Sequence, residues 1–192
     1  LVGERDVFRL QHHPNLFHDF KIILVDQHDY QLFTPTLYEI ATTPEEVANA
    51  IELKTIVTFP LKKALGRSES IFIQGRVASI DFKEKFVSIK DGSRIDFEYL
   101  VIAIGGETNY FGIPGLEEHS YPFKNLYDAL RIREAILALF QDSSPELSFL
   151  IAGAGPTGVE FAGELSRWVL YLEKTSKKHC TCNITLMDAA PE

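Results

Sequence analysis

Cysteine is scarce in this chain: only two of its 192 residues are cysteine, Cys180 and Cys182. One residue separates them, so they do not form the C-x-x-C pair of a dithiol redox centre, and two cysteines cannot build a disulfide framework. With His179 they form a short cluster that has too few ligands for a metal site. We therefore expect no bound metal and a reduced, cytoplasmic setting.

Positive charge and long hydrophobic runs are also in short supply. Lys and Arg number 19 against 27 Asp and Glu, a formal net charge of −8, so neither nucleic acid nor an anionic membrane is an expected electrostatic partner. No apolar run reaches the length of a transmembrane helix, and the start does not read as a signal peptide. The chain has no initiating Met and stops shortly after an expected strand, so we expect a fragment of a longer protein.

The most informative stretch is 147–164, LSFLIAGAGPTGVEFAGE. Its order is apolar strand, G-x-G-x-x-G turn and helix, which a dinucleotide site requires. Gly153 permits the sharp turn, Gly155 removes a Cβ that would block a pyrophosphate, and Gly158 lets the helix lie close to the strand. The helix N-terminus supplies free N–H groups and a positive dipole end to phosphates, and Pro156 costs no needed hydrogen bond at the first helical position.

Two strands in the chain end in an acidic residue, which can bind ribose hydroxyls in a dinucleotide fold. One covers 184–187 and is followed by Asp188; the other covers 21–25 and is followed by Asp26. Upstream of Asp26 only Gly3 is present, so the glycine turn that should precede this strand is not found. From this segment alone, the favoured interpretation of Asp26 is an ordinary strand-end carboxylate.

The remaining segments complete an α/β pattern. A capping box at Thr43 to Glu46 predicts a short helix to about Ile51, and 61–65 predicts a helical turn that ends at Gly66. Alternating residues between 71 and 97, with an Asp91-Gly92 turn, predict a three-stranded antiparallel meander. Residues 99–103 read as a buried strand, and Asn125 is expected to cap a helix of about four turns.

Three segments resemble a known family, the type II NADH:quinone oxidoreductases, which are FAD-containing flavoproteins with two dinucleotide-binding domains. The segments are VDQHDYQLFTPTLYEIATT at 25–43, LVIAIGGETNYFGIPGL at 100–116 and AGAGPTGVEFAGE at 152–164. The resemblance implies an α/β fold of two Rossmann-like three-layer units, both incomplete, with the β-meander in the first. It places the FAD-binding domain at 1–115, without its first strand and glycine loop, and the first half of the NADH-binding domain at 116–192.

The resemblance also implies cofactor contacts in the first domain. Asp26 would bind the FAD ribose. Val77 would lie in the meander strand that runs past the adenine, and its backbone would contact the adenine. Pro35 or Thr36 would lie near the isoalloxazine. Close backbone approach to FAD is expected at Ala103, Gly105 and Gly106.

In the second domain the resemblance implies an NADH site. NADH would contact Gly153, Gly155, Pro156, Thr157 and Gly158, and Asp188 would hold the ribose hydroxyls and disfavour a 2′-phosphate. Asp188 lies farther from the glycine motif than the usual ~20 residues, because a long helix and connector intervene. Glu160 would approach the nicotinamide as the catalytic carboxylate; the alternative is a solvent-facing residue that the helix dipole favours.

The implied activity is electron transfer from NADH through FAD to a quinone, with both cofactors supplying the chemistry. Expected partners are NADH and a quinone, with a homodimer left open, and membrane contact is expected only through parts absent from this sequence. The expected location is therefore the cytoplasm or the cytoplasmic face of a membrane. On its own, a chain without the first glycine loop is expected to retain little FAD and to be inactive.

Two alternatives remain open. A sulfide:quinone or ferredoxin-type reductase belongs to the same superfamily, although Cys180 and Cys182 lie in the wrong half for sulfide chemistry near a flavin. A non-catalytic nucleotide-binding module is the alternative from another class, and the missing first glycine loop favours it.

Overall fold

The computed structural model describes residues 21–44, 48–66, 70–141, 146–176 and 181–189. These residues form two compact units that are interleaved along the chain: residues 1–31 and 59–107 belong to the first, and residues 32–58 and 108–192 to the second. Residues 1–20 and the His179–Cys180 pair lie outside the described residues. The strands β2, Tyr30–Leu32, and β3, Thr58–Pro60, pair where the chain passes between the units.

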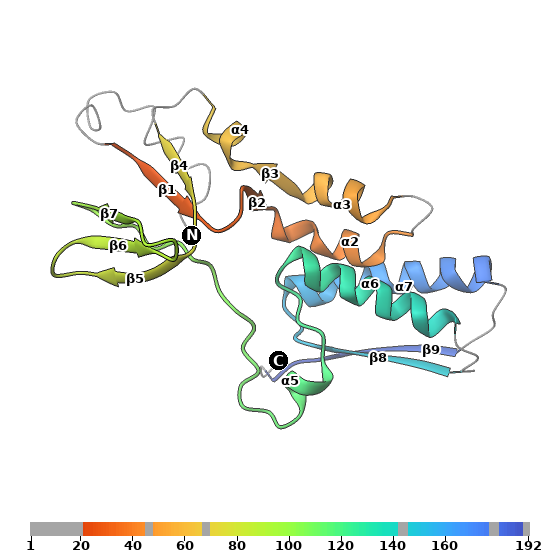
Figure 1. Ribbon diagram of the computed structural model, residues 1–192. Coiled ribbons are helices and arrows are strands. Elements are labelled where there is room, and N and C mark those ends of the chain that lie inside the picture. The colour runs from red at the N-terminus through yellow and green to blue at the C-terminus, as the bar shows by residue number, and fades with distance from the viewer. Residues whose placement is uncertain (1–20, 45–47, 67–69, 142–145, 177–180, 190–192) are drawn as a thin grey trace. The chain divides into compact units, whose positions relative to one another are not determined.

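The first unit contains a parallel strand pair and an antiparallel meander (Figure 1). The strands β1, Ile23–Asp26, and β4, Ile71–Gln74, pair in parallel register, with Asp26 opposite Gln74. The short helix α4, Leu61–Leu65, ends at Gly66, whose φ of 58° suits the expected glycine stop. The meander consists of β5, β6 and β7, which cover Val77–Asp81, Phe86–Ile89 and Arg94–Asp96. The expected meander is therefore confirmed, while Ile71–Gln74 belongs to the parallel pair.

The second unit places helices over one face of a parallel strand pair (Figure 1). Its strands are β8, Glu146–Ala152, and β9, Thr181–Met187, and between them runs the helix α7, Pro156–Ser176. The other elements are η1 at Thr34–Thr36, α2 at Leu37–Thr42, α3 at Ala50–Val57, α5 at Leu116–His119 and α6 at Leu126–Gln141. The strand–turn–helix–strand order that the sequence predicts is confirmed.

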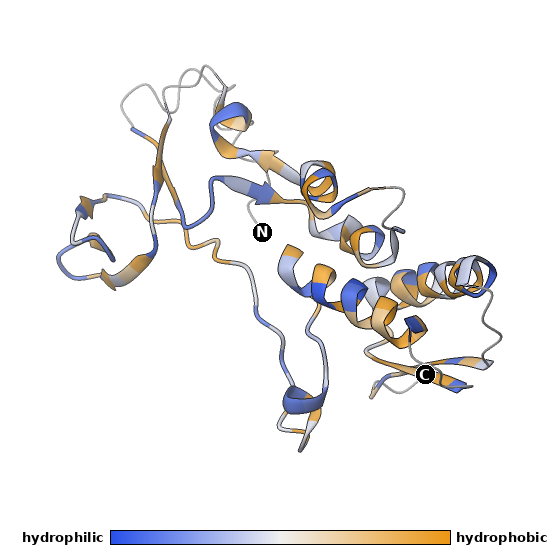
Figure 2. Cartoon of the chain, turned by 45° about the vertical axis from the view of Figure 1, so that its right-hand side comes forward, coloured by the Kyte–Doolittle hydropathy of each residue, from blue (hydrophilic) through white to orange (hydrophobic). Residues whose placement is uncertain are grey.

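Apolar side chains from α2, α3, α6, α7 and β8 form the core of the second unit. Its most deeply buried members include Leu37, Ile40, Leu53, Val57 and Leu165. Along β8 burial alternates, since Leu147 is buried and Phe149 and Ile151 pack on the core, while Leu150 is exposed. Helices α6 and α7 carry hydrophobic and hydrophilic residues on different sides, as amphipathic helices do (Figure 2).

Two local expectations are wrong. Residues 99–103 form no strand, and Tyr99, Val101 and Ile102 are exposed. A parallel strand needs a neighbour, and among the described residues β1 and β4 pair only with each other. The helix expected from Thr43 to about Ile51 instead begins at Ala50, with a capping box at Asn49: the Asn49 side chain accepts from the backbone N–H groups of Ile51 and Glu52, and Glu52 accepts from the Asn49 N–H. Glu46, the partner of the box expected at Thr43, lies outside the described residues. Helix α3 therefore begins later than the pattern at Thr43 predicts.

The helix cap at Asn125 is confirmed. Oδ1 of Asn125 accepts from the Asp128 N–H at 2.9 Å, and the Asp128 carboxylate accepts from the N–H groups of Lys124 and Asn125. Helix α6 then extends over 16 residues, and Ala129, Ile136 and Phe140 are buried on the expected apolar face.

Candidate dinucleotide site

The glycine loop joins β8 to α7, and its three motif glycines occupy three different environments. Gly153 has a φ of 118°, a backbone conformation that residues with a Cβ rarely adopt. A Cβ at Gly155 would meet no atom within 4 Å, so the backbone there borders open space. A Cβ at Gly158 would lie 1.9 Å from the Gly153 carbonyl oxygen and 3.5 Å from Cδ1 of Leu186. The turn, the open approach and the close packing expected of these glycines are all present.

The open side of the loop has the donors that a phosphate needs. Helix α7 begins at Pro156, and its first backbone bond within this motif joins the Val159 N–H to the Gly155 carbonyl at 3.1 Å. Because Pro156 has no N–H, the donors at this helix N-terminus come from Gly155, Thr157 and Gly158. All three lie at the positive end of a helix of 21 residues. These features fit a pyrophosphate, which is how the NADH contacts expected here would be made.

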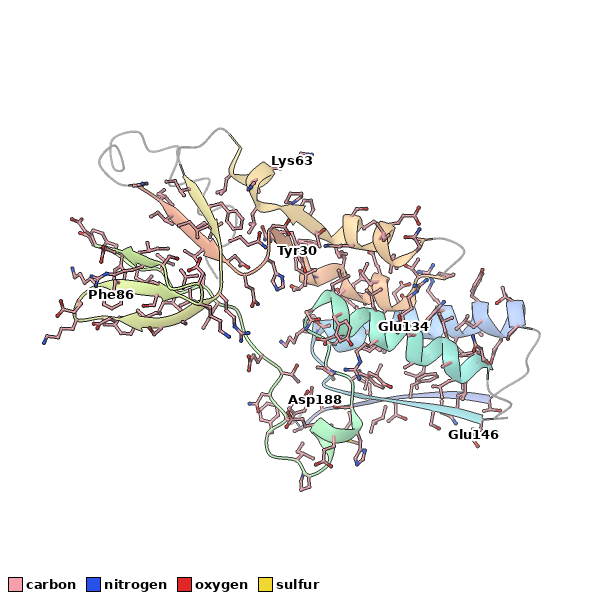
Figure 3. The ribbon with its side chains drawn as sticks, viewed as in Figure 1. Tyr30, Lys63, Phe86, Glu134, Glu146 and Asp188 are labelled. Atoms are coloured by element: carbon pink, nitrogen blue, oxygen red, sulfur yellow. The ribbon has the colours of Figure 1, made fainter. Side chains whose placement is uncertain are left out.

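Asp188 lies directly beyond the end of β9, next to the glycine loop. Figure 3 labels Glu146 at the beginning of β8 and Asp188 at the opposite end of the same sheet. The Asp188 carboxylate Oδ2 accepts a hydrogen bond from the Ala154 N–H at 2.6 Å, and the Met187 carbonyl accepts one from the Gly153 N–H at 2.7 Å. The fold thus brings together the glycine motif and the acid 34 residues away.

Glu160 is exposed, four residues after the start of α7 at Pro156, and its charge acts on Tyr38 of α2. Desolvation raises the pKa of the Tyr38 phenol above its ordinary value of 10.0, and the negative charges of Glu39, Glu160 and Glu164 raise it further. Glu164 in turn forms an ion pair with Arg167 at 2.9 Å on the same helix. The nicotinamide role expected of Glu160 stays a prediction.

In the first unit Asp26 closes β1, and its Oδ1 accepts from the His28 N–H at 2.8 Å. The Asp26 carbonyl accepts from the Gly75 N–H at 2.8 Å, which brings the segment before β5 and Val77 close to this strand end. Ala103, Gly105 and Gly106 lie in the exposed stretch 101–107, and Gly105 has a φ of 72°. The expected FAD contacts of these residues stay predictions.

Pro35 and Thr36 lie in η1, directly before α2, and Oγ1 of Thr36 donates to the Phe33 carbonyl at 3.2 Å. They belong to the same compact unit as the glycine loop. The contact units and the expected cofactor domains therefore divide the chain differently in 32–58 and 108–115. The cofactor domains at 1–115 and 116–192 stay a prediction.

Sequence patterns did not identify three residues with defined contacts in the second unit. Ala154 acts through its backbone N–H, so its side chain carries no signal. The pKa of Tyr38 is raised by desolvation, by Glu39 and by two acids of α7, and those two acids lie more than a hundred residues away along the chain. Arg133 is 5% exposed and donates to the carbonyls of Thr43 and Ala48 at 2.8 and 3.3 Å, where only its position within an apolar helix face hinted at a role.

Comparison with known proteins gives a consistent result. The family model described as pyridine nucleotide-disulphide oxidoreductase matches residues 7–192. A demethylphylloquinone reductase of Synechocystis is 35% identical over 150 residues, covering 76% of this chain and 35% of that protein. A type II NADH:quinone oxidoreductase of Staphylococcus saprophyticus is 28% identical over 180 residues, covering 90% of this chain and 43% of that protein.

Among solved structures, NDH2 of Plasmodium falciparum in complex with NADH superimposes with a TM-score of 0.69 at 20% identity. The match covers 86% of this chain and 36% of that one. The resemblance and the Rossmann-like α/β fold class inferred from the sequence are thereby confirmed. The chain spans between 35% and 43% of the length of these relatives.

Proposed function

Because this chain belongs to the pyridine nucleotide-disulphide oxidoreductase family, we propose that it binds NADH at the glycine loop of α7 and FAD in its first unit, and that its protein passes electrons from NADH through FAD to a quinone. When bound, NADH supplies a hydride and FAD accepts two electrons and passes them on. The observation that carries the proposal is the geometry of the loop: open space at Gly155, a helix N-terminus behind it, and Asp188 beside it.

The chain's own residues position the nucleotide. The N–H groups of Gly155, Thr157 and Gly158 would bind the pyrophosphate, with the dipole of α7 favouring its negative charge. Asp188 would accept from the adenosine ribose hydroxyls and repel a 2′-phosphate, so NADH is favoured over NADPH. Glu160 would orient the nicotinamide end from near the N-terminus of α7.

The first unit would hold FAD through Asp26 at the end of β1, the Val77 backbone, and the glycines at 105 and 106. The electron acceptor is proposed from the relatives, one named as a demethylphylloquinone reductase and another as an NADH:quinone oxidoreductase. No helix in the part of the chain that the structure describes has the length and hydropathy to span a bilayer. A cytoplasmic or peripheral membrane location is part of the same proposal, as is a homodimer.

The test is an absorption spectrum, with a flavin assay, of the purified full-length protein to which this chain belongs, recorded before and after addition of NADH. The proposal expects bound flavin that bleaches on addition of NADH and is reoxidised by a quinone. A colourless protein that binds NADH would favour the non-catalytic module instead. Reoxidation by ferredoxin would replace the quinone as the electron acceptor, and reduction by sulfide would replace NADH as the donor. Cys182, packed on the core from β9, argues against the sulfide reaction.

A further inference from the structure

The glycine loop is attached to the end of β9 by two consecutive hydrogen bonds. The Gly153 N–H donates to the Met187 carbonyl, and the Ala154 N–H donates to the Asp188 carboxylate. The first bond joins backbone to backbone and is independent of residue type. The second depends on the Asp188 side chain, so one substitution can remove it without touching the sheet.

The side-chain bond is a strong one for its position. Its length of 2.6 Å and its ionised acceptor are features of charge-assisted hydrogen bonds, which are about twice as strong as neutral ones. It acts on a part of the loop that borders open space, because a Cβ at Gly153 or Gly155 would meet no neighbour within 4 Å. Ala154 and Asp188 are both exposed, so water competes for the bond and its strength depends on the charge.

We propose that Asp188 is a positioning residue for the glycine loop, which it holds in the phosphate-binding conformation through the Ala154 N–H before any nucleotide binds. The inference rests on the proposed NADH function and adds a second role to the ribose contact. If Asp188 has both roles, it disfavours NADPH through two separate effects. A 2′-phosphate meets the charge of Asp188, and a nucleotide that displaces this carboxylate also releases the loop that must bind its pyrophosphate.

Two substitutions separate the effect of the Asp188 charge from the effect of its hydrogen bond to the Ala154 N–H. Asp188→Asn keeps an oxygen acceptor for the Ala154 N–H and removes the charge. Asp188→Ala removes both. The matched control is Asp81→Ala in the other unit, where the Asp81 carboxylate accepts from the N–H groups of Lys83 and Glu84 in an exposed turn.

Hydrogen exchange of the full chain without nucleotide tests the positioning role directly. Exchange at the Ala154 N–H is expected to rise roughly tenfold in Asp188→Ala, to rise less in Asp188→Asn, and to stay unchanged in Asp81→Ala. Unchanged exchange at Ala154 in Asp188→Ala would overturn the inference. An equal rise at Phe149 and Ile151 would also overturn it, because the whole strand would then have loosened.

Titration of the same variants with NADH and with NADPH tests the consequence. Asp188→Asn should lower the preference for NADH with little loss of NADH affinity, whereas Asp188→Ala should weaken both nucleotides. Equal behaviour of the two variants toward both nucleotides would contradict a positioning role. A wild-type chain that binds neither nucleotide would overturn the proposed NADH site, while the exchange result would still decide the loop contact.

Discussion

At the scale of single residues, the glycine motif separates a structural requirement from a binding requirement. Gly158 has no room for a Cβ because the Gly153 carbonyl fills that space, so the fold needs a glycine there with or without a ligand. Gly155 has open space in the same direction, so nothing within the described protein requires a glycine there. The open position is therefore where a bound pyrophosphate would explain the residue.

Gly155→Ala is expected to leave the free energy of unfolding within about 0.5 kcal/mol of wild type, because its Cβ would enter open space. It should weaken NADH binding by roughly tenfold or more, since the same Cβ would meet the pyrophosphate. Fluorescence titration with NADH and a denaturant curve measure the two quantities. Unchanged NADH affinity would contradict the assigned position of the pyrophosphate.

Gly158→Ala is expected to destabilise the chain by about 1–3 kcal/mol, because backbone atoms must move to admit the Cβ. The matched control is Gly163→Ala on the same helix, where a Cβ meets no neighbour and should stabilise by about 0.5–1 kcal/mol. Urea unfolding of the three proteins provides the comparison. Equal stability of both variants would show that the close contact at Gly158 does not prevent the chain from accommodating a Cβ there.

Tyr38 gives a pH dependence whose sign follows from its environment. Its pKa is raised in the folded chain by desolvation and then by Glu39, Glu160 and Glu164, so the unfolded state ionises first as the pH rises. The contribution of Tyr38 to the stability of the folded chain is therefore fully present below the ordinary pKa of 10.0. It is lost as the pH rises through the higher pKa of the folded chain.

Glu160→Gln is expected to lower the pKa of Tyr38, because it removes one of these negative charges. NMR of chains labelled at the tyrosine ring carbon would follow the phenol during an alkaline titration. Glu84→Gln, on a turn of the meander, is the control and should leave the pKa of Tyr38 unchanged. An unchanged pKa of Tyr38 in Glu160→Gln would show that the charge of Glu160 does not act on the Tyr38 phenol.

At the scale of elements, helix ends depend on which polar side chain reaches the free N–H groups. Thr43 and Asn49 are both acceptable caps by residue type, and both are followed three residues later by Glu. The structure uses Asn49, whose Oδ1 lies 2.9 and 3.1 Å from the N–H groups of Ile51 and Glu52. The hydroxyl of Thr43 instead donates to the Glu39 carbonyl at the end of α2.

Asn49→Ala is therefore expected to cost about 0.5–2 kcal/mol of stability, the usual loss for an N-cap. Thr43→Ala, at the cap that the sequence pattern favours, should change stability by less than about 0.5 kcal/mol. Denaturant unfolding of both variants measures the difference. A larger loss in Thr43→Ala would restore the cap that the pattern predicts.

At the scale of the whole molecule, the second unit depends on a segment inserted within the sequence of the first. Residues 32–58 supply Leu37, Ile40, Leu53 and Val57 to the core formed with α6 and α7. Arg133 of α6 reinforces this connection, because its buried guanidinium donates to two carbonyls of the same segment.

Arg133→Met is expected to lower the free energy of unfolding by about 1.5–3 kcal/mol, because two carbonyls lose a charged donor. Hydrogen exchange should rise in α2 and α3 and stay unchanged in the meander of the other unit. Arg131→Met on the exposed side of α6, where the guanidinium lies over Tyr121 and Tyr127, should have an effect within about 0.5 kcal/mol. An equal rise of exchange in β5–β7 would contradict separate units.

The sequence alone determined those features of this protein that depend on contacts between residues close together along the chain. The strand, glycine turn and helix at 147–164 follow from neighbouring residues alone, as do the Asn125 cap and the β-meander, because each depends on contacts only a few positions apart. The identity of Asp188 as a strand-end acid was equally readable.

Contacts across long sequence separations accounted for the rest. The apolar run at 99–103 has the composition of a buried strand, yet strand formation requires a neighbour that composition does not provide. The packing of 32–58 with α7 depends on side chains far away along the chain. The hydrogen bond from Ala154 to Asp188 is of the same kind, because it forms only when the fold closes the loop against the end of β9.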